Sequence, residues 1–159
     1  MIGKVGTADY LAAFVRECSI KDVDGIRANR LSVVGREREN VFAIAQQLQR
    51  AGIVCCILSN TIALHWEKLN SHHDYPSLSV FDRIFASHLV ARAKPRRSAF
   101  SYVAHALKLR MSECLLVDDT PLNVDKAKAA GWRGFLFTDA VSFQHRLSTE
   151  LTASDGAKA

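Results

Sequence analysis

Two adjacent aspartates, Asp118 and Asp119, stand where a short apolar run ends. The Leu-Leu-Val run at 115–117 predicts a buried strand, and Pro121 with the alanine-rich stretch after it predicts a turn that leads into a helix. Both carboxylates therefore fall at the carboxyl end of a strand, where open α/β sheets place ligand chemistry. Because neighbouring carboxylates repel each other, the pair indicates a hard cation such as Mg²⁺. The alternative is that Asp119 or Thr120 merely caps the helix.

Two further polar positions follow apolar or extended segments. The run IVCCIL at 53–58 predicts a buried parallel strand, and Ser59 and Asn60 come directly after it. A hydroxyl group and backbone amides at such a point can hold phosphate oxygens. Lys94 precedes Pro95, which favours extended backbone at the lysine and begins a helix well.

Helices and strands are predicted to alternate through the second two thirds of the chain. Helical periodicity marks residues 8–19, 37–50, 62–70, 96–110 and 143–151, while 80–86 and 134–138 predict two more short extended segments. No sustained period marks residues 20–35. The alternation predicts an α/β fold with a parallel sheet covered by helices on both faces.

Length, hydrophobic content and net charge limit the classes of protein to which this chain can belong. The 159 residues, 48% of them hydrophobic, suffice for one domain with a real core. No apolar run is long enough to span a membrane and no signal-peptide pattern is present, so we expect a cytoplasmic protein. The net charge of +5 permits anionic ligands, but the basic residues at 92–97 lack interleaved aromatic residues, so nucleic acid is not expected. Neither the four cysteines nor the pair His72 and His73 has the spacing of a zinc site.

Taken together, the strings ILSNT, AKP and LLVDDTPLNVDKAKAAGW resemble the haloacid dehalogenase superfamily of phosphatases and related hydrolases, over about residues 37–139. They look like the subgroup with a helical cap inserted after the first strand. The resemblance implies a Rossmann-like parallel sheet flanked by helices. It also implies Mg²⁺-dependent phosphomonoester hydrolysis, in which an aspartate attacks phosphorus and forms an aspartyl-phosphate.

The resemblance also assigns roles at the phosphate. Ser59 would hydrogen-bond the phosphoryl group, with Asn60 beside it. Lys94 would neutralise charge that develops on the phosphoryl oxygens and would hold the nucleophile. A small phosphorylated metabolite is the implied substrate.

At the metal, the resemblance assigns Asp119 as a direct Mg²⁺ ligand. Asp118 would bind the ion as well or orient one of its water molecules. Asn123 would hold the metal-binding loop in place without binding the ion itself.

The first motif of the family, an apolar strand that ends in Asp-x-Asp near the start of the chain, has no convincing counterpart. Asp22 and Asp24 lie in the string DVDG, but the residues before it alternate poorly, and Ile26 stands where a threonine is usual. The interval from Asp24 to Ser59 is also too short for an inserted cap. We expect a surface turn here; the alternative is that Asp22 is the nucleophile and Asp24 the acid and base.

The better fit is a chain that begins after the catalytic strand. Residues 1–36 would then be a helical remnant of the cap, 37–151 the core, and 152–159 a flexible tail. A sheet without its first, central strand exposes edges, so we expect a homodimer or a partner that donates a strand, and no membrane partner.

Three classes of function stay open at this stage. The chain could be a working phosphatase, a non-catalytic module that binds Mg²⁺ or phosphate, or an assembly protein in which the acid pair only caps a helix. A phosphoacceptor receiver domain also begins with a similar acid pair. It would need several strands after Asp118, and too little chain follows.

Overall fold

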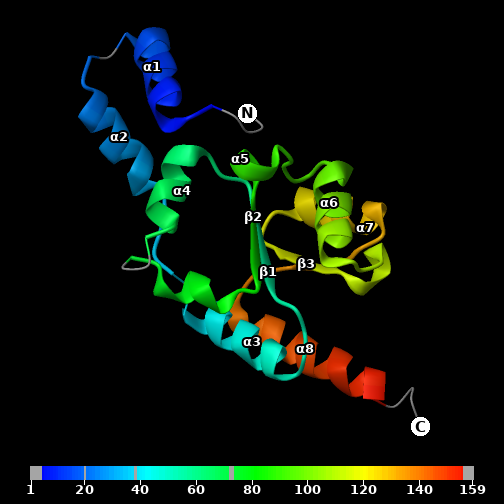
Figure 1. Cartoon of the computed structure of the whole chain (residues 1–159). Helices are drawn as coiled ribbons and strands as arrows, with labels where there is room; N and C mark the ends of the chain where they lie inside the picture. Colours follow the sequence, from blue (N-terminus) through cyan, green and yellow to red (C-terminus); the bar gives the residue numbers. More distant parts are fainter. Residues whose placement is uncertain (1–4, 20, 38, 72–73, 156–159) are drawn as a thin grey trace. The chain divides into compact units, whose positions relative to one another are not determined.

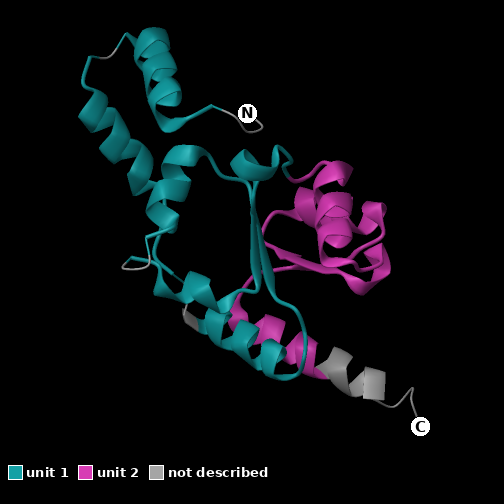
Figure 2. Cartoon of the chain, viewed as in Figure 1, with its two compact units in different colours: residues 1–93 teal, residues 94–159 magenta. Residues whose placement is uncertain are grey.

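A computed structural model describes residues 5–19, 21–37, 39–71 and 74–155 (Figure 1). The histidine pair at 72 and 73 lies outside these residues. The chain divides into two compact units, an N-terminal unit of residues 1–93 and a C-terminal unit of residues 94–159 (Figure 2). The helices before residue 37 thus share a unit with the first half of the expected core.

The N-terminal unit combines helices with one pair of strands. In chain order it holds α1 (Thr7–Cys18), α2 (Val23–Ser32), α3 (Glu39–Arg50), β1 (Cys56–Ser59), α4 (Ala63–Leu69), a 3₁₀ helix (Pro76–Val80), β2 (Arg83–Ala86) and α5 (Ser87–Val90). The two strands are parallel, and Ser59 at the end of β1 stands opposite Ala86 at the end of β2. Both strands therefore end at the same edge of this sheet.

A small apolar core joins three of these helices. Tyr10 and Leu11 of α1, Ile26 of α2 and Leu64 of α4 are all buried together. Helix α2 was not predicted, because its stretch of sequence has no sustained period. It forms because the Asp22 side chain caps its first turn and because Ile26 packs into this core.

Helix α3 is fastened to the segment that precedes β2. The rings of Phe42 and Phe81 meet edge to face with their centroids 5.7 Å apart. The Gln49 amide donates to the carbonyl oxygen of Val80 at 2.7 Å and to the Asp82 carboxylate at 3.0 Å. These contacts hold α3 beside the segment that enters the sheet.

The C-terminal unit repeats the strand-helix-strand pattern. It holds α6 (Arg97–Leu107), a 3₁₀ helix (Met111–Glu113), β3 (Leu115–Asp118), α7 (Pro121–Ala130), β4 (Arg133–Leu136) and α8 (Ala140–Asp155). Strands β3 and β4 are parallel, with Asp118 opposite Leu136. The prediction of an α/β fold with parallel strands flanked by helices is confirmed.

The core of the C-terminal unit lies between its helices and strands. Phe100 and Val103 of α6, Leu116 of β3 and Val124 of α7 are buried. Helix α7 lies very close to β4. A Cβ atom added at Gly134 of β4 would lie only 3.0 Å from Val124 Cγ1 of α7. This packing holds α7, the helix that follows Asp118 and Asp119, against the sheet.

Within the described residues, the strands form two sheets of two strands each. None of these four strands ends in an Asp-x-Asp sequence. None of the described helices has the length and apolar character needed to cross a bilayer.

Candidate active site

Asp118 is the most tightly held residue of the predicted site. It ends β3 and is 8% exposed. Its Oδ1 atom accepts from the Thr120 amide and from Asn123 Nδ2, both at 2.9 Å. Its Oδ2 atom accepts from Lys94 Nζ at 2.5 Å. Three donors therefore fix the orientation of this carboxylate.

The pKa of Asp118 is held below its ordinary value. Burial raises the pKa, but the hydrogen bonds from Lys94, Asn123 and the Thr120 amide together outweigh that effect, and the positive charge of Lys94 adds to them. Asp118 is therefore a carboxylate at neutral pH. It can accept hydrogen bonds or bind a cation but cannot donate a proton.

Lys94 reaches Asp118 across 24 residues of sequence. The Lys94 side chain is 13% exposed and the Asp118 side chain 5%, so water screens this ion pair poorly. Lys94 stands just before α6, which places a positive charge at the carboxyl end of β3.

Asn123 and Asp119 occupy different environments beside this pair. Asn123 lies in the first turn of α7, is 9% exposed and donates to Asp118. Asp119 is exposed, and its Oδ1 atom accepts from the Thr120 hydroxyl at 3.4 Å. The structure thus brings together Lys94, Asp118 and Asn123, with the Asp119 carboxylate adjacent in sequence.

The two carboxylates suit Mg²⁺ by their chemistry. No group of three His, Cys, Asp or Glu side chains forms a metal-binding cluster in the part of the chain that the structure describes. Mg²⁺ does not require one, because it is commonly bound by one or two carboxylates together with water and phosphate oxygens. The side chains of Asp118 and Asp119 carry oxygen atoms of the kind that could bind it.

Ser59 and Asn60 belong to the N-terminal unit. Ser59 is half-buried at the end of β1, and Asn60 is exposed in the next position. The residue after them, Thr61, is buried and is held by the hydroxyl group of Ser87. The sequence did not predict the contact of Ser87 with Thr61 or that of the Thr120 amide with Asp118. The only signal in the sequence was a small polar residue at or just beyond the end of a strand, one residue after β2 for Ser87 and two after β3 for Thr120.

The DVDG string does not follow a strand. Asp22 is the N-cap of α2, and its Oδ1 atom accepts from the Gly25 amide at 2.8 Å. A Cβ atom at Gly25 would lie only 2.2 Å from Asp22 Oδ2, so a larger residue there would displace the capping side chain. Asp24 is exposed in the first turn of the helix. These contacts are those of a capping turn.

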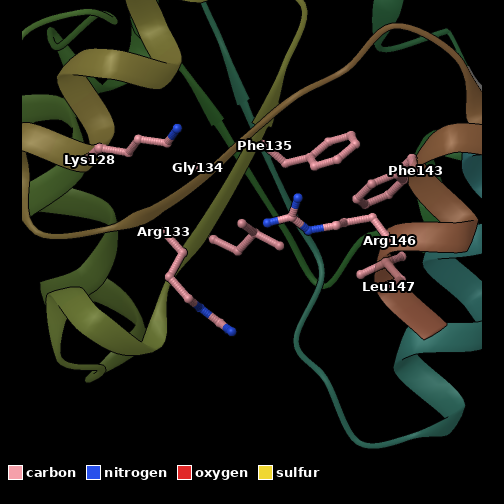
Figure 3. A pocket seen from close by; sticks show the side chains of 8 residues that line it. Lys128, Arg133, Gly134, Phe135, Phe143, Arg146 and Leu147 are labelled. Atoms are coloured by element: carbon pink, nitrogen blue, oxygen red, sulfur yellow. The ribbon is translucent and has the colours of Figure 1, made fainter. Parts of the chain in front are cut away.

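A cavity of about 300 Å³ in the C-terminal unit lies away from Asp118 (Figure 3). It begins at Leu115, the opposite end of β3, and Arg146 extends into it from α8. Lys128 and Arg133 also line it. None of the residues predicted for the site is among its described lining residues. The candidate site is therefore the carboxyl end of β3 rather than this cavity.

The fold and this strand-end group match one family. The sequence pattern of the haloacid dehalogenase-like hydrolases covers residues 4–131, and the chain belongs to this family. The resemblance inferred from the motifs is confirmed.

Individual relatives support the same assignment. The chain is 28% identical over 108 residues to the sesquiterpene phosphatase astK of Aspergillus oryzae. That match takes in 67% of this chain and 54% of the relative, so the chain spans about half the length of that protein.

Solved structures show the same fold. A predicted HAD-like hydrolase from Porphyromonas gingivalis superimposes with a TM-score of 0.78, at 21% identity, over 91% of this chain and 74% of that one. A HAD family enzyme from Bacteroides thetaiotaomicron, solved with magnesium and inorganic phosphate, gives a TM-score of 0.71 at 20% identity. That match covers 84% of this chain and 70% of the enzyme.

Proposed function

We propose that this chain provides the metal- and phosphate-binding part of a Mg²⁺-dependent phosphomonoester hydrolase. The observation that carries the proposal is the buried ion pair between Lys94 and Asp118, closed by Asn123 and followed by the exposed carboxylate of Asp119. An ion pair withdrawn from water and tied by additional hydrogen bonds is a typical arrangement at sites of charge-dependent chemistry.

Each of these side chains has a distinct task in the proposal. Asp119 and Asp118 hold Mg²⁺, which when bound offsets the negative charge of a phosphate ester. Lys94 keeps Asp118 ionised and supplies a positive charge for the phosphoryl oxygens. Asn123 keeps the Asp118 carboxylate in one orientation.

Ser59 and Asn60 supply hydrogen bonds to the phosphoryl group in this proposal. Ser59 ends β1 as Asp118 ends β3, at the carboxyl end of a parallel strand, and Asn60 is the next residue. The substrate class is a small phosphorylated metabolite. The similarity to a phosphatase supports a phosphate ester as the class of substrate.

The nucleophile is the open part of the proposal. Asp22 and Asp24 are engaged at the start of a helix, and none of the described strands ends in Asp-x-Asp. We infer that the nucleophilic carboxylate comes from a strand contributed by another chain. Without that strand, the chain is a non-catalytic module that binds Mg²⁺ or phosphate.

The edge of β3 that faces away from β4 could pair with a donated strand. The amide groups of Arg133 and Phe137 donate to the carbonyl oxygens of Cys114 and Asp118, so alternate residues of β3 bond toward β4. The peptide groups of Leu115 and Val117 accordingly face the other edge, where no described strand pairs. Strand edges of this kind accept further strands, and sheets of two strands are only marginally stable alone.

Hydrolysis of an aryl phosphate, measured with and without Mg²⁺, tests this proposal. The wild type is compared with Asp22→Asn, Asp119→Asn and Lys94→Met, and Asp125→Asn on the exposed side of α7 serves as the control. In a preparation that contains the strand donor, we expect Mg²⁺-dependent turnover that is lost in Asp119→Asn and Lys94→Met but kept in Asp22→Asn and Asp125→Asn. Loss in Asp22→Asn would make DVDG the first motif and would contradict a donated strand.

Light scattering tests whether the chain forms a homodimer, which would have twice the mass of 17.6 kDa.

A binding measurement separates the catalytic from the non-catalytic alternative. Binding of inorganic phosphate with Mg²⁺, without turnover, would favour the non-catalytic module. A folded wild type that neither binds phosphate nor turns over substrate would contradict both.

A further inference from the structure

One buried hydroxyl group in the N-terminal unit closes the loop that follows β1. The Thr61 amide donates to Ser87 Oγ at 2.9 Å, and Ser87 Oγ donates to the Thr61 carbonyl oxygen at 2.9 Å. Ser87 is 3% exposed and Thr61 9%. A serine hydroxyl can donate once and accept twice, so it satisfies both backbone groups of Thr61 at the same time.

This contact stands where the sheet stops. The register of β1 and β2 ends with Ser59 opposite Ala86, and Ser87 is the next residue after that pair. The hydroxyl group therefore replaces the backbone hydrogen bonds that a longer pair of strands would have made. Leaving a buried amide or carbonyl group without a partner costs about 1–3 kcal/mol, so the loop has little freedom to move away from Ser87.

Fixing Thr61 also fixes its neighbours. Because each peptide unit is planar, the position of the Thr61 amide sets the direction of the Asn60 carbonyl group. In the same way, the Thr61 carbonyl group sets the direction of the Ile62 amide. The whole turn from Ser59 to Ile62 is thereby attached to the end of β2.

We propose that Ser87 is a positioning residue that holds the Ser59–Asn60–Thr61 loop in the conformation that binds a phosphoryl group. This inference rests on the proposed function, which gives Ser59 and Asn60 to the phosphate. Binding groups must be held within about 0.5 Å of their productive position, and a two-bond contact across 26 residues of sequence provides that constraint.

The test uses the full chain with three substitutions. Ser87→Ala removes the hydroxyl group, Ser87→Thr keeps it, and Ser79→Ala is the matched control. The Ser79 hydroxyl is exposed and donates only to the carbonyl oxygen of Pro76 in its own turn. Nuclear magnetic resonance reports two quantities, the exchange rate of single amide protons and the Kd of inorganic phosphate in Mg²⁺ buffer.

We expect Ser87→Ala to speed exchange at the Thr61 amide and to weaken phosphate binding, each by about tenfold, which corresponds to the loss of one hydrogen bond. The amide of Ile57 within β1 should stay unchanged, which shows that the sheet is intact. Ser87→Thr should restore both quantities, and Ser79→Ala should leave both at the wild-type level.

Two results would overturn the inference and are distinguishable. If the wild type binds phosphate and Ser87→Ala binds it equally well, Ser87 has a purely structural role although the proposed function stands. If the wild type does not bind phosphate, the proposed function itself fails and Ser87 has no site to position.

Discussion

Lys94 Nζ lies 2.5 Å from Asp118 Oδ2, and both side chains are largely withdrawn from water. Lys94 stands before α6 and Asp118 ends β3, so the contact fastens the start of the C-terminal unit to the edge where its strands end. Asp118 accepts two further hydrogen bonds, which leaves it fixed and ionised. This relationship is both a structural anchor and the centre of the proposed site.

Asp118→Asn is expected to lower the free energy of unfolding by about 2 kcal/mol, because it removes the negative charge that pairs with the largely buried Lys94 ammonium group. Urea unfolding measures this change, followed by the fluorescence of Trp132 in a chain whose other tryptophan, Trp66 of the N-terminal unit, is replaced by phenylalanine. The control Asp125→Asn should unfold like the wild type.

The double variant Lys94→Met with Asp118→Asn tests the coupling between the two residues. Because neither charge then remains buried without its partner, it should be more stable than Asp118→Asn alone. Additive losses would contradict a coupled pair.

The depressed pKa of Asp118 predicts how stability depends on pH. The contribution of this carboxylate to the free energy of unfolding is present above the unfolded pKa of 3.8 and is lost as the pH falls through the lower pKa of the folded chain.

Asn123→Ala is expected to weaken Mg²⁺ binding by about tenfold while leaving the fold intact, because the Asp118 carboxylate loses one of the donors that orient it. Calorimetric titration with MgCl₂ measures the affinity. Leu122→Ala is the matched control, since Leu122 is the preceding residue of α7 and is 53% exposed. Equal Mg²⁺ affinity in both variants would remove Asn123 from the site.

Gly134→Ala is expected to destabilise the C-terminal unit by about 1–3 kcal/mol, because the added methyl group presses on Val124 of α7. The added Cβ atom would lie 3.0 Å from Val124 Cγ1, 3.1 Å from Lys128 Cγ and 3.1 Å from the Val124 carbonyl oxygen. Gly35→Ala offers the comparison, since no atom lies within 4 Å of a Cβ atom there. Equal midpoints of urea unfolding for the two variants would show that α7 yields without cost.

Cys55 is expected to react slowly with iodoacetamide at pH 8. Burial, with smaller contributions from the charges of Asp82 and Cys56, raises the pKa of the Cys55 thiol to about 11. Only the thiolate is reactive, and it makes up roughly a thousandth of the Cys55 side chains at that pH. Peptide mass mapping should find Cys18, which is exposed, labelled first.

The rate at which Cys55 reacts should increase as the pH rises toward 11. At pH 8, unfolding the chain in urea should also increase this rate. Because the thiol ionises more readily in the unfolded chain, its contribution also lowers stability as the pH rises above about 9. Labelling of Cys55 as fast as Cys18 in the folded chain at pH 8 would contradict this prediction.

Local patterns were enough to find the strands and the residues that end them. The apolar runs before Ser59 and Asp118 stand out from their flanking turns, and β1 and β3 form there, each paired with a parallel strand. The helices α1, α3, α6 and α7 also lie within a few residues of their expected positions. Apolar periodicity and helix breakers are properties of neighbouring residues, so the sequence carries them directly.

Helix α2 and the division into two units depend on more than local sequence. The stretch that forms α2 has no sustained period, and its formation rests on the Asp22 cap together with the burial of Ile26 against α1 and α4. The division between residues 93 and 94 falls within the segment that sequence patterns assigned to one core. Both features result from packing between distant segments.

The sequence by itself determined the family, the parallel α/β fold and the identity of the acid pair, because motifs and periodicity are written in adjacent residues. Only the tertiary structure decided that Lys94 contacts Asp118 and that Ser87 holds Thr61. These pairs are separated by 24 and 26 residues of sequence. A contact between such distant residues depends on how helices and strands pack, and that packing is set by burial over the whole unit rather than by any local pattern.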